Sequence, residues 1–360
     1  MSYPLSTIYF YLTSYCNLSC IHCWISPRYL KGREAPDETD LSRLKEIIDQ
    51  AIPLGLKSIK LTGGEPFLSR HTLPLISYAS DKKLKVVIET NGVLVDEGIA
   101  KFLKENNAGF VSVSLDGSTS EVHEAVRKER GSFDKAVTGI KNLKKYGINT
   151  QVIFSIYKKN ALFLEDTISF SEKLGADSLK INCISMVSRG ELLNKEGQTL
   201  AVKEYIDLNN KIEEELKTRY KIKIILDLPP AFKSLKNIKM EASTCGLKGI
   251  IGVLPDGKIS ICGIGEVLSS LVLGDIREET LERIWENNPL LSSIRQDLPR
   301  KLEGICGDCI LKTLCLGKCR AEAYYRNNNI FSPFYFCEEA NRLGLFPENR
   351  RLKTYKEASR

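Results

Sequence analysis

The chain has 360 residues, of which 42% are hydrophobic and 27% are charged, and its formal net charge is +7. This composition is typical of a globular protein, and the length suffices for two domains or for one α/β barrel with a small extension. No stretch approaches the roughly 20 apolar residues of a membrane span, and the basic residues are interspersed with acidic ones, so neither a membrane protein nor a nucleic-acid-binding module is predicted.

From residue 6 to about 183, β-rich runs alternate with amphipathic helical stretches, the βα pattern of a parallel sheet. The predicted strands are 7–13, 57–62, 84–90, 109–116, 148–156 and 176–184. The predicted helices between them are 40–53, 71–81, 95–106, 119–146 and 162–174. Six βα units are too few for a closed eight-stranded barrel. The prediction is therefore an α/β fold with a partial, TIM-like (β/α)6 barrel and its active site at the C-terminal ends of the strands.

Four regions follow from this pattern: a barrel over residues 1–190, a helical connector over 191–240, a cysteine-rich domain over 241–345 and a basic tail over 346–360. The connector contains a long charged helix at about 200–218 and a β-like run at 221–228. In the cysteine-rich domain, helices are short and turns are frequent, so we expect bound metal to stabilise its fold.

The chain contains eleven cysteines, and its N-terminus lacks a basic leader before the first strand. These features predict a cytoplasmic protein, in which disulfides are rare and clustered cysteines more often hold metal. Cys16, Cys20 and Cys23 follow the first strand with the spacing C-x3-C-x2-C. Three thiolates suit a [4Fe-4S] cluster with one iron free of protein ligands. A zinc site with a distant fourth ligand and a redox pair are the alternatives.

The stretch from Cys16 to Cys23 resembles the signature of the radical S-adenosylmethionine (radical SAM) superfamily. The resemblance implies that S-adenosylmethionine (AdoMet) binds the open iron and is reductively cleaved to a 5′-deoxyadenosyl radical, which abstracts hydrogen from the substrate. Most members have an aromatic residue immediately before the third cysteine. Here His22 occupies that place, and we expect it to present its flat face to the adenine.

Three further motifs at strand ends resemble those of this superfamily and imply AdoMet contacts. Gly63, Gly64, Glu65 and Pro66 follow the second strand, where glycines allow close backbone approach and a carboxylate can pair with the methionine ammonium group. The Thr90-Asn91-Gly92 turn follows the third strand. After the fourth strand, Ser114, Asp116 and Arg127 match residues near the methionine carboxylate, with Arg130 as the competitor of Arg127.

The C-terminal region contains seven more cysteines: Cys245, Cys262, Cys306, Cys309, Cys315, Cys319 and Cys337. Two structural zinc ions would be one explanation. The spacing resembles the SPASM extension of radical SAM enzymes, which implies two auxiliary [4Fe-4S] clusters and three clusters in all. By motif position, Cys306, Cys309, Cys315 and Cys337 would hold the outer cluster. Cys245, Cys262 and Cys319 would hold the inner one, which then has an open iron or a non-cysteine ligand.

Three other positions bear on the chemistry. Sulfatase maturases have an acid directly after the cysteine that matches Cys262, but this chain has Gly263, which argues against the same base. Cys183, at the end of the sixth strand, is a buried structural thiol, or else a hydrogen donor, a substrate-linking thiol or the missing ligand. Arg189 lies in a segment that resembles the Gly-Arg-Gly element after this strand in SPASM proteins, and we expect it to order the barrel mouth or the substrate.

The resemblance implies a radical SAM oxidoreductase of the type that matures ribosomally made peptides. A flavodoxin or ferredoxin would supply the electron, and a separate leader-recognition protein could be required because only 15 residues precede Cys16. Oxidative decarboxylation of a tetrapyrrole, as in the haem-synthesis members, is the second hypothesis. A non-catalytic iron–sulfur electron carrier is the third.

Overall fold

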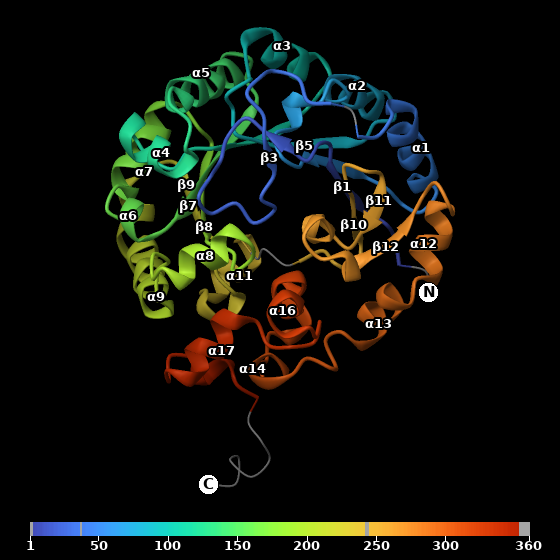
Figure 1. Ribbon diagram of the computed structural model, residues 1–360. Helices are drawn as coiled ribbons and strands as arrows, with labels where there is room; N and C mark the ends of the chain where they lie inside the picture. Colours follow the sequence, from blue (N-terminus) through green and yellow to red (C-terminus); the bar gives the residue numbers. More distant parts are fainter. Residues whose placement is uncertain (1–2, 37, 242–244, 353–360) are drawn as a thin grey trace.

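The computed structural model of the protein describes residues 3–36, 38–241 and 245–352. Seven parallel strands lie side by side in one sheet, and helices cover its outer side (Figure 1). The strands are β1 (Thr7–Tyr11), β4 (Ser58–Thr62), β5 (Lys85–Thr90), β6 (Phe110–Ser114), β7 (Asn149–Ile156), β8 (Ser178–Cys183) and β9 (Lys223–Leu226). The first six are the predicted strands, and the sheet does not close, so the partial barrel is confirmed.

The helices that follow the barrel strands pack against the sheet through aliphatic side chains. They are α1 (Leu41–Ala51), α2 (Thr72–Asp81), α3 (Glu97–Glu105), α4 (Ser120–Arg127), α5 (Ser132–Lys145), α6 (Lys158–Ala161) and α7 (Leu164–Lys173). Ile47 and Ile48 of α1, for example, are fully buried in the same core as Phe10 and Ile59 of the strands. Each such side chain contributes about 1.5–3 kcal/mol by leaving water.

The single helix predicted over 119–146 is in fact two helices. Lys128 ends α4 in the left-handed conformation, with φ 59°, and Gly131 precedes α5 with φ 77°. The Glu124 side chain accepts a hydrogen bond from the Gly131 amide at 2.7 Å, which stabilises this turn. The break places Arg127 at the end of α4, where its side chain can reach the loop that carries Cys16, Cys20 and Cys23, here called the first cysteine loop.

The predicted connector does more than link two domains, because residues 223–226 of its β-like run form β9, which pairs in parallel with β8. Ile224 and Leu226 are buried on one face of this strand, so its apolar alternation explains the pairing. The other elements of this region are α8 (Arg189–Lys195), α9 (Val202–Lys211), a π-helical turn (Ile212–Leu216), α10 (Lys217–Arg219) and α11 (Leu235–Glu241).

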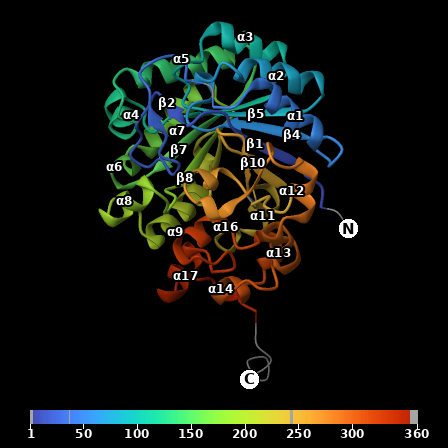
Figure 2. The ribbon, with the colours of Figure 1, turned by 45° about the vertical axis from the view of Figure 1, so that its right-hand side comes forward.

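The C-terminal region extends the other edge of the sheet. Strand β10 (Ile250–Val253) pairs in parallel with β1 (Figure 2). Strands β11 (Lys258–Ser260) and β12 (Val272–Asp275) continue the sheet as antiparallel strands (Figure 1). Short helices then follow across the open side of the barrel (Figure 1). They are α12 (Leu281–Asn287), α13 (Pro289–Asp297), α14 (Gly304–Gly307), α15 (Lys312–Cys315), α16 (Arg320–Asn327) and α17 (Tyr335–Arg342).

No helix in the described part of the chain combines the length and the apolar character that a membrane crossing requires. Of the predicted basic tail, residues 353–360 lie outside the described residues.

Candidate active site

A cavity of about 550 Å³ lies at the C-terminal ends of the barrel strands. Side chains from both predicted domains line it, because the C-terminal region packs across the barrel opening. The barrel contributes Cys16, Cys20, His22, Cys23, Gly63, Gly64, Thr90, Asn91, Ser114, Arg127 and Cys183, and the C-terminal region contributes Cys262 and Cys319. The predicted motifs, which are far apart in the sequence, therefore converge on one space.

The first cysteine loop is held from several sides. Its start forms β2 (Tyr15–Cys16), which pairs in parallel with β3 (Arg28–Tyr29). Asn91 Nδ2 lies 3.8 Å from the Cys16 Sγ, and Arg127 Nη1 lies 3.5 Å from the Cys20 Sγ, each in donor geometry. Arg189 Nη1 donates to the Cys20 carbonyl at 3.2 Å, so it contacts this loop; its role in ordering the barrel mouth or the substrate stays a prediction.

The three thiols fit an iron–sulfur cluster chemically. All three line the cavity, and burial raises the pKa of Cys16 and of Cys23 above the usual thiol value. A bare thiolate is therefore unfavourable there, and a cationic metal would offset that cost. Among the described residues, no three His, Cys, Asp or Glu side chains lie close enough together to bind a single metal ion. A [4Fe-4S] cluster makes a different demand, because each thiolate binds a different iron of the cluster.

The Gly63–Pro66 turn crosses the cysteine loop at close range. A Cβ atom on Gly64 would lie 1.8 Å from the Tyr15 carbonyl oxygen, so only glycine fits there. Glu65 is fully buried and is not among the cavity-lining residues. Its carboxylate accepts hydrogen bonds from Thr90 Oγ1 at 2.7 Å and from the Asn91 amide at 2.8 Å. Glu65 thus ties two motif turns together, and burial raises its pKa to about 7.

Arg127 is positioned by a buried carboxylate. Its Nε lies 2.6 Å from Asp116 Oδ2, and the other carboxylate oxygen accepts from the Ser155 amide at 2.8 Å. Although burial lowers it, the pKa of Arg127 is raised overall by Asp116 and by Cys20. Arg127 Nη2 is buried without a hydrogen-bond partner among the described residues, an unmet donor suited to a carboxylate.

The other residues of this motif have distinct roles. Ser114 lines the cavity, whereas Asp116 is buried behind it and does not line it. His123 is a packing residue, since its ring contacts Phe133 and its Nδ1 accepts from the Asp116 amide at 3.2 Å. Arg130, the competitor of Arg127, is exposed.

His22 lines the cavity beside the cysteine loop. Its Nδ1 is buried without a hydrogen-bond partner among the described residues. Burial lowers the pKa of His22 to about 4, so the imidazole is neutral near pH 7 and available to a ligand as a flat, uncharged ring. An adenine contact for His22 stays a prediction.

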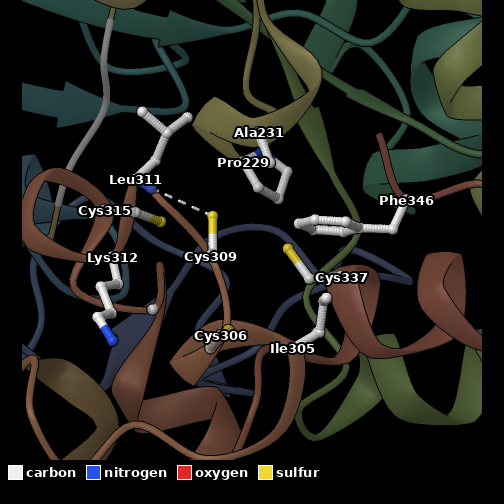
Figure 3. Close-up of a pocket in the computed structure, with 11 residues that line it drawn as sticks. Pro229, Ala231, Ile305, Cys306, Cys309, Leu311, Lys312, Cys315, Cys337 and Phe346 are labelled. Atoms are coloured by element: carbon white, nitrogen blue, oxygen red, sulfur yellow. Dashed lines mark hydrogen bonds between the residues drawn. The ribbon is translucent and has the colours of Figure 1, made fainter. Parts of the chain in front are cut away.

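The predicted outer set of cysteines comes together around a second, small cavity (Figure 3). Cys306, Cys309, Cys315 and Cys337 all line it, together with Pro229 and Phe346. A hydrogen bond between the thiols of Cys306 and Cys337 lowers the pKa of Cys306 and raises the pKa of Cys337. Four thiols in an otherwise apolar pocket fit the fourfold thiolate ligation of an iron–sulfur cluster.

The predicted inner set is separate from this pocket, because none of its three cysteines lines it. Cys262 and Cys319 line the large cavity, and Cys245 interacts electrostatically with both. The ring of Tyr11 occupies the space beside Gly263: a Cβ there would lie 2.2 Å from the Tyr11 Cε1. This packing explains why position 263 carries no acidic side chain.

Cys183 lines the large cavity from the end of β8. Its Sγ lies 3.9 Å from the Asp227 carbonyl, and burial raises the pKa of the thiol. Cys183 is therefore a neutral thiol. The structure does not group it with either auxiliary set.

Sequence reasoning missed a group of charged residues in the same cavity. Lys60, Glu89, Lys180, Asp227, Lys318 and Glu322 all line it. One sequence feature could have indicated these residues: each of the apolar strands β4 and β8 contains a charged residue, Lys60 and Lys180, at a position that faces the cavity. That signal depends on strand register, which the sequence alone leaves open.

Comparison with known families matches residues 10–170 to the radical SAM superfamily and residues 245–310 to an iron-sulfur cluster-binding domain, SPASM. The two matched segments contain the first cysteine loop, the AdoMet motifs and four of the seven C-terminal cysteines.

Among curated proteins, an AdoMet-dependent heme synthase of Methanosarcina barkeri is 29% identical over 344 residues, which cover 91% of this chain and 94% of that protein. The antilisterial bacteriocin subtilosin biosynthesis protein AlbA of Bacillus subtilis is 28% identical over 334 residues, covering 89% of this chain and 69% of that protein. Among solved structures, Streptococcus suis SuiB bound to its precursor peptide SuiA aligns with a TM-score of 0.73 and 19% identity, over 94% of this chain and 76% of that one. At that identity the likeness concerns the fold.

Proposed function

Because the chain is a radical SAM superfamily enzyme with a SPASM domain, we propose that it abstracts a hydrogen atom from a peptide substrate and thereby modifies that peptide. One observation carries the proposal: the AdoMet motifs, the first cysteine loop and two cysteines of the inner set all line a single cavity. A substrate in this cavity would contact both redox sites at once.

When bound, a reduced [4Fe-4S] cluster and AdoMet supply a 5′-deoxyadenosyl radical that abstracts hydrogen from the substrate. The residues of the chain bind and orient these groups. Cys16, Cys20 and Cys23 would hold the first cluster, and Arg127 would offer its Nη2 donor to the methionine carboxylate beside Ser114. Glu65 acts behind the cavity wall by fixing Thr90 and Asn91. The inner and outer cysteine sets would hold two further clusters.

The charges in the cavity favour a peptide over a tetrapyrrole. Lys60 lies 2.5 Å from Glu89, Lys318 lies 2.5 Å from Asp227, and Arg127 lies 2.6 Å from Asp116. These cations are already paired with carboxylates. A tetrapyrrole carries several carboxylates on its rim, and burying them would require several uncommitted cations. AlbA, a biosynthesis protein of the bacteriocin subtilosin, supports the peptide class further.

The test is co-expression of the enzyme with a short peptide encoded beside its gene, followed by mass spectrometry of the peptide. The expected result is a peptide that has lost two hydrogen atoms. The amount of this modified peptide should equal the amount of 5′-deoxyadenosine formed. The Cys16→Ala/Cys20→Ala/Cys23→Ala variant is the control and should return the peptide unmodified. A peptide of unchanged mass beside an enzyme that cleaves AdoMet would count against this substrate class.

Oxidative decarboxylation of a tetrapyrrole is the second candidate, and sequence similarity favours it. The match to the M. barkeri heme synthase covers 94% of that protein, whereas the match to AlbA covers 69% of AlbA. This candidate predicts that the enzyme converts iron coproporphyrin with loss of carbon dioxide. Incubation of the reduced enzyme with that compound and AdoMet, followed by mass spectrometry, separates the two candidates.

We further propose that an external flavodoxin or ferredoxin supplies the electron and that a separate protein recognises the leader of the peptide. The net charge of +7 supports encounter with an acidic electron carrier. A reconstituted system with such a carrier in place of a chemical reductant would test the first point.

A further inference from the structure

A row of alternating charges crosses the large cavity from the barrel to the C-terminal region. Lys60 of β4 pairs with Glu89 of β5, and Asp227 pairs with Lys318. The charge of Lys180 on β8 acts on both carboxylates, Glu89 and Asp227, and lowers the pKa of each. All five side chains line the cavity.

Lys180 differs from the other cavity cations in how it is held. Its Nζ lies 3.6 Å from Asp227 Oδ2, beyond hydrogen-bond length, whereas each of the other cations that line the described cavity has a carboxylate oxygen within 2.6 Å. Asp227 is already hydrogen-bonded to Lys318. An ammonium group has three donors, so Lys180 retains donors that can be directed at a ligand.

Asn182 supplies a second, independent feature on the same strand. It also lines the cavity, and because side chains two residues apart point to the same face, it lies beside Lys180. Its Oδ1 is buried without a hydrogen-bond partner among the described residues. A buried acceptor of this kind normally has a partner, so the position is suited to an N–H group of a ligand.

We propose that Lys180 and Asn182 form a docking site for a carboxylate of the substrate and for a neighbouring N–H group. Residues two apart in a strand are separated by about 6.5 Å, a span that one amino-acid residue can bridge between its carboxylate and its amide. In a peptide, the carboxylate comes from the chain terminus or from an acidic side chain. The contact of Asn182 with an N–H group rests on the proposed peptide substrate. The contact of Lys180 with a carboxylate is the main part of the inference.

The test measures the binding of defined probes to the cluster-loaded enzyme with AdoMet and without reductant, by equilibrium dialysis and mass spectrometry. The peptide probes are acetyl-Ala-Ala-Ala with a free carboxylate, acetyl-Ala-Glu-Ala-amide and the neutral acetyl-Ala-Gln-Ala-amide. Coproporphyrin III is the fourth probe. The first two separate a terminal from a side-chain carboxylate, and the last represents a carboxylate from a tetrapyrrole.

The expected result is that at least one anionic peptide binds about tenfold more tightly than the neutral one, as a charged hydrogen bond would provide. Lys180→Met and Lys180→Gln should each remove this preference, and Lys180→Arg should retain it. Asn182→Leu should weaken binding of the preferred peptide. Lys203→Met is the matched control, since Lys203 is exposed on α9 and pairs with Asp207 at 2.8 Å.

Equal binding of neutral and anionic probes would overturn the inference, as would a preference that survives in both Lys180→Met and Lys180→Gln. Loss of AdoMet binding in these variants would overturn it too, because Lys180 would then serve the cofactor. If only coproporphyrin III binds in a Lys180-dependent way, the carboxylate site stands and the peptide function fails. If a peptide is modified without any such preference, the function stands and the docking site fails.

Discussion

At the scale of single residues, the site depends on buried charges that are already satisfied by protein partners. Asp116 is fully buried, and its two carboxylate oxygens bind Arg127 and the Ser155 amide. Arg127 in turn lies against the Cys20 thiol. The motif thus positions the Arg127 guanidinium through a carboxylate that does not itself line the cavity.

Replacing Asp116 by asparagine should therefore weaken both the fold and cofactor binding. The change leaves the Arg127 guanidinium buried without its counter-charge, at a cost of about 3–5 kcal/mol. We expect a lower thermal unfolding midpoint and weaker AdoMet binding by calorimetry. Arg130→Met is the control, because Arg130 is exposed, and it should leave both unchanged. Normal AdoMet affinity in the Asp116→Asn variant would contradict the positioning role.

Glu65 predicts a pH dependence of stability. Burial raises the pKa of Glu65 to about 7 from its usual value of 4.5, so between these values the folded chain retains a proton that the unfolded chain releases. Stability should consequently fall as pH rises through this window and level off above about 7, by up to about 3 kcal/mol.

Glu65→Gln should remove this dependence, because an amide does not ionise. The measurement is the difference in thermal unfolding midpoint between the variant and the wild type, between pH 5.5 and pH 8. The wild type should lose stability relative to the variant as pH increases. A difference that is constant across this range would show that Glu65 is ionised throughout.

The sequence identified the residues that belong to contiguous motifs, such as Cys16 and Arg127, because their spacing is local. It assigned Glu65 a direct ligand contact, which stays a prediction; the hydrogen bonds of the Glu65 carboxylate to Thr90 and Asn91 were not foreseen. Lys180 and Asn182 could not be identified, because an inward direction on β8 follows from strand register and from the C-terminal region that covers the barrel.

At the scale of elements, close packing connects the barrel to the inner cysteine set. The ring of Tyr11, from β1, fills the space next to Gly263, directly after Cys262. Strand β10, which precedes Cys262, pairs with β1 itself. The inner cysteine set is therefore built on the first strand of the barrel, although almost 240 residues separate β1 from β10 in sequence.

Replacing Gly263 by alanine should disturb the inner set of cysteines and leave Cys16, Cys20 and Cys23 in place. The added Cβ would overlap the Tyr11 ring and cost about 1–3 kcal/mol, as overpacking typically does. We expect reduced iron content with the AdoMet-cleaving cluster retained, as judged by iron analysis and electron paramagnetic resonance. Gly32→Ala is the control, since nothing lies within 4 Å of a Cβ at that position. Full iron content in the Gly263→Ala variant would contradict this dependence.

The order of the parallel strands was predictable because each βα unit has its own apolar periodicity. The break between α4 and α5 was not, since residues 119–146 have a continuous helical pattern and only the left-handed Lys128 and the Gly131 turn interrupt it. The pairing of β9 with β8 and of β10 with β1 was also missed. Parallel pairing between distant segments leaves no local signal.

At the scale of the whole molecule, the C-terminal region both extends the sheet and covers the cavity. It contributes Cys262, Lys318 and Cys319 to the cavity wall, so neither part of the chain forms the site alone. This arrangement explains why the two matched domains occur in one chain. It also implies that a change in the fold of the C-terminal region would alter the shape of the cavity.

The most direct test of the account is AdoMet cleavage by the reduced, cluster-loaded enzyme, measured as 5′-deoxyadenosine. The wild type should produce this nucleoside. The Cys16→Ala/Cys20→Ala/Cys23→Ala variant should produce none and should lose about a third of the bound iron, because the two auxiliary sets remain intact. Undiminished cleavage in the triple variant would contradict the assignment of these three cysteines to the catalytic cluster.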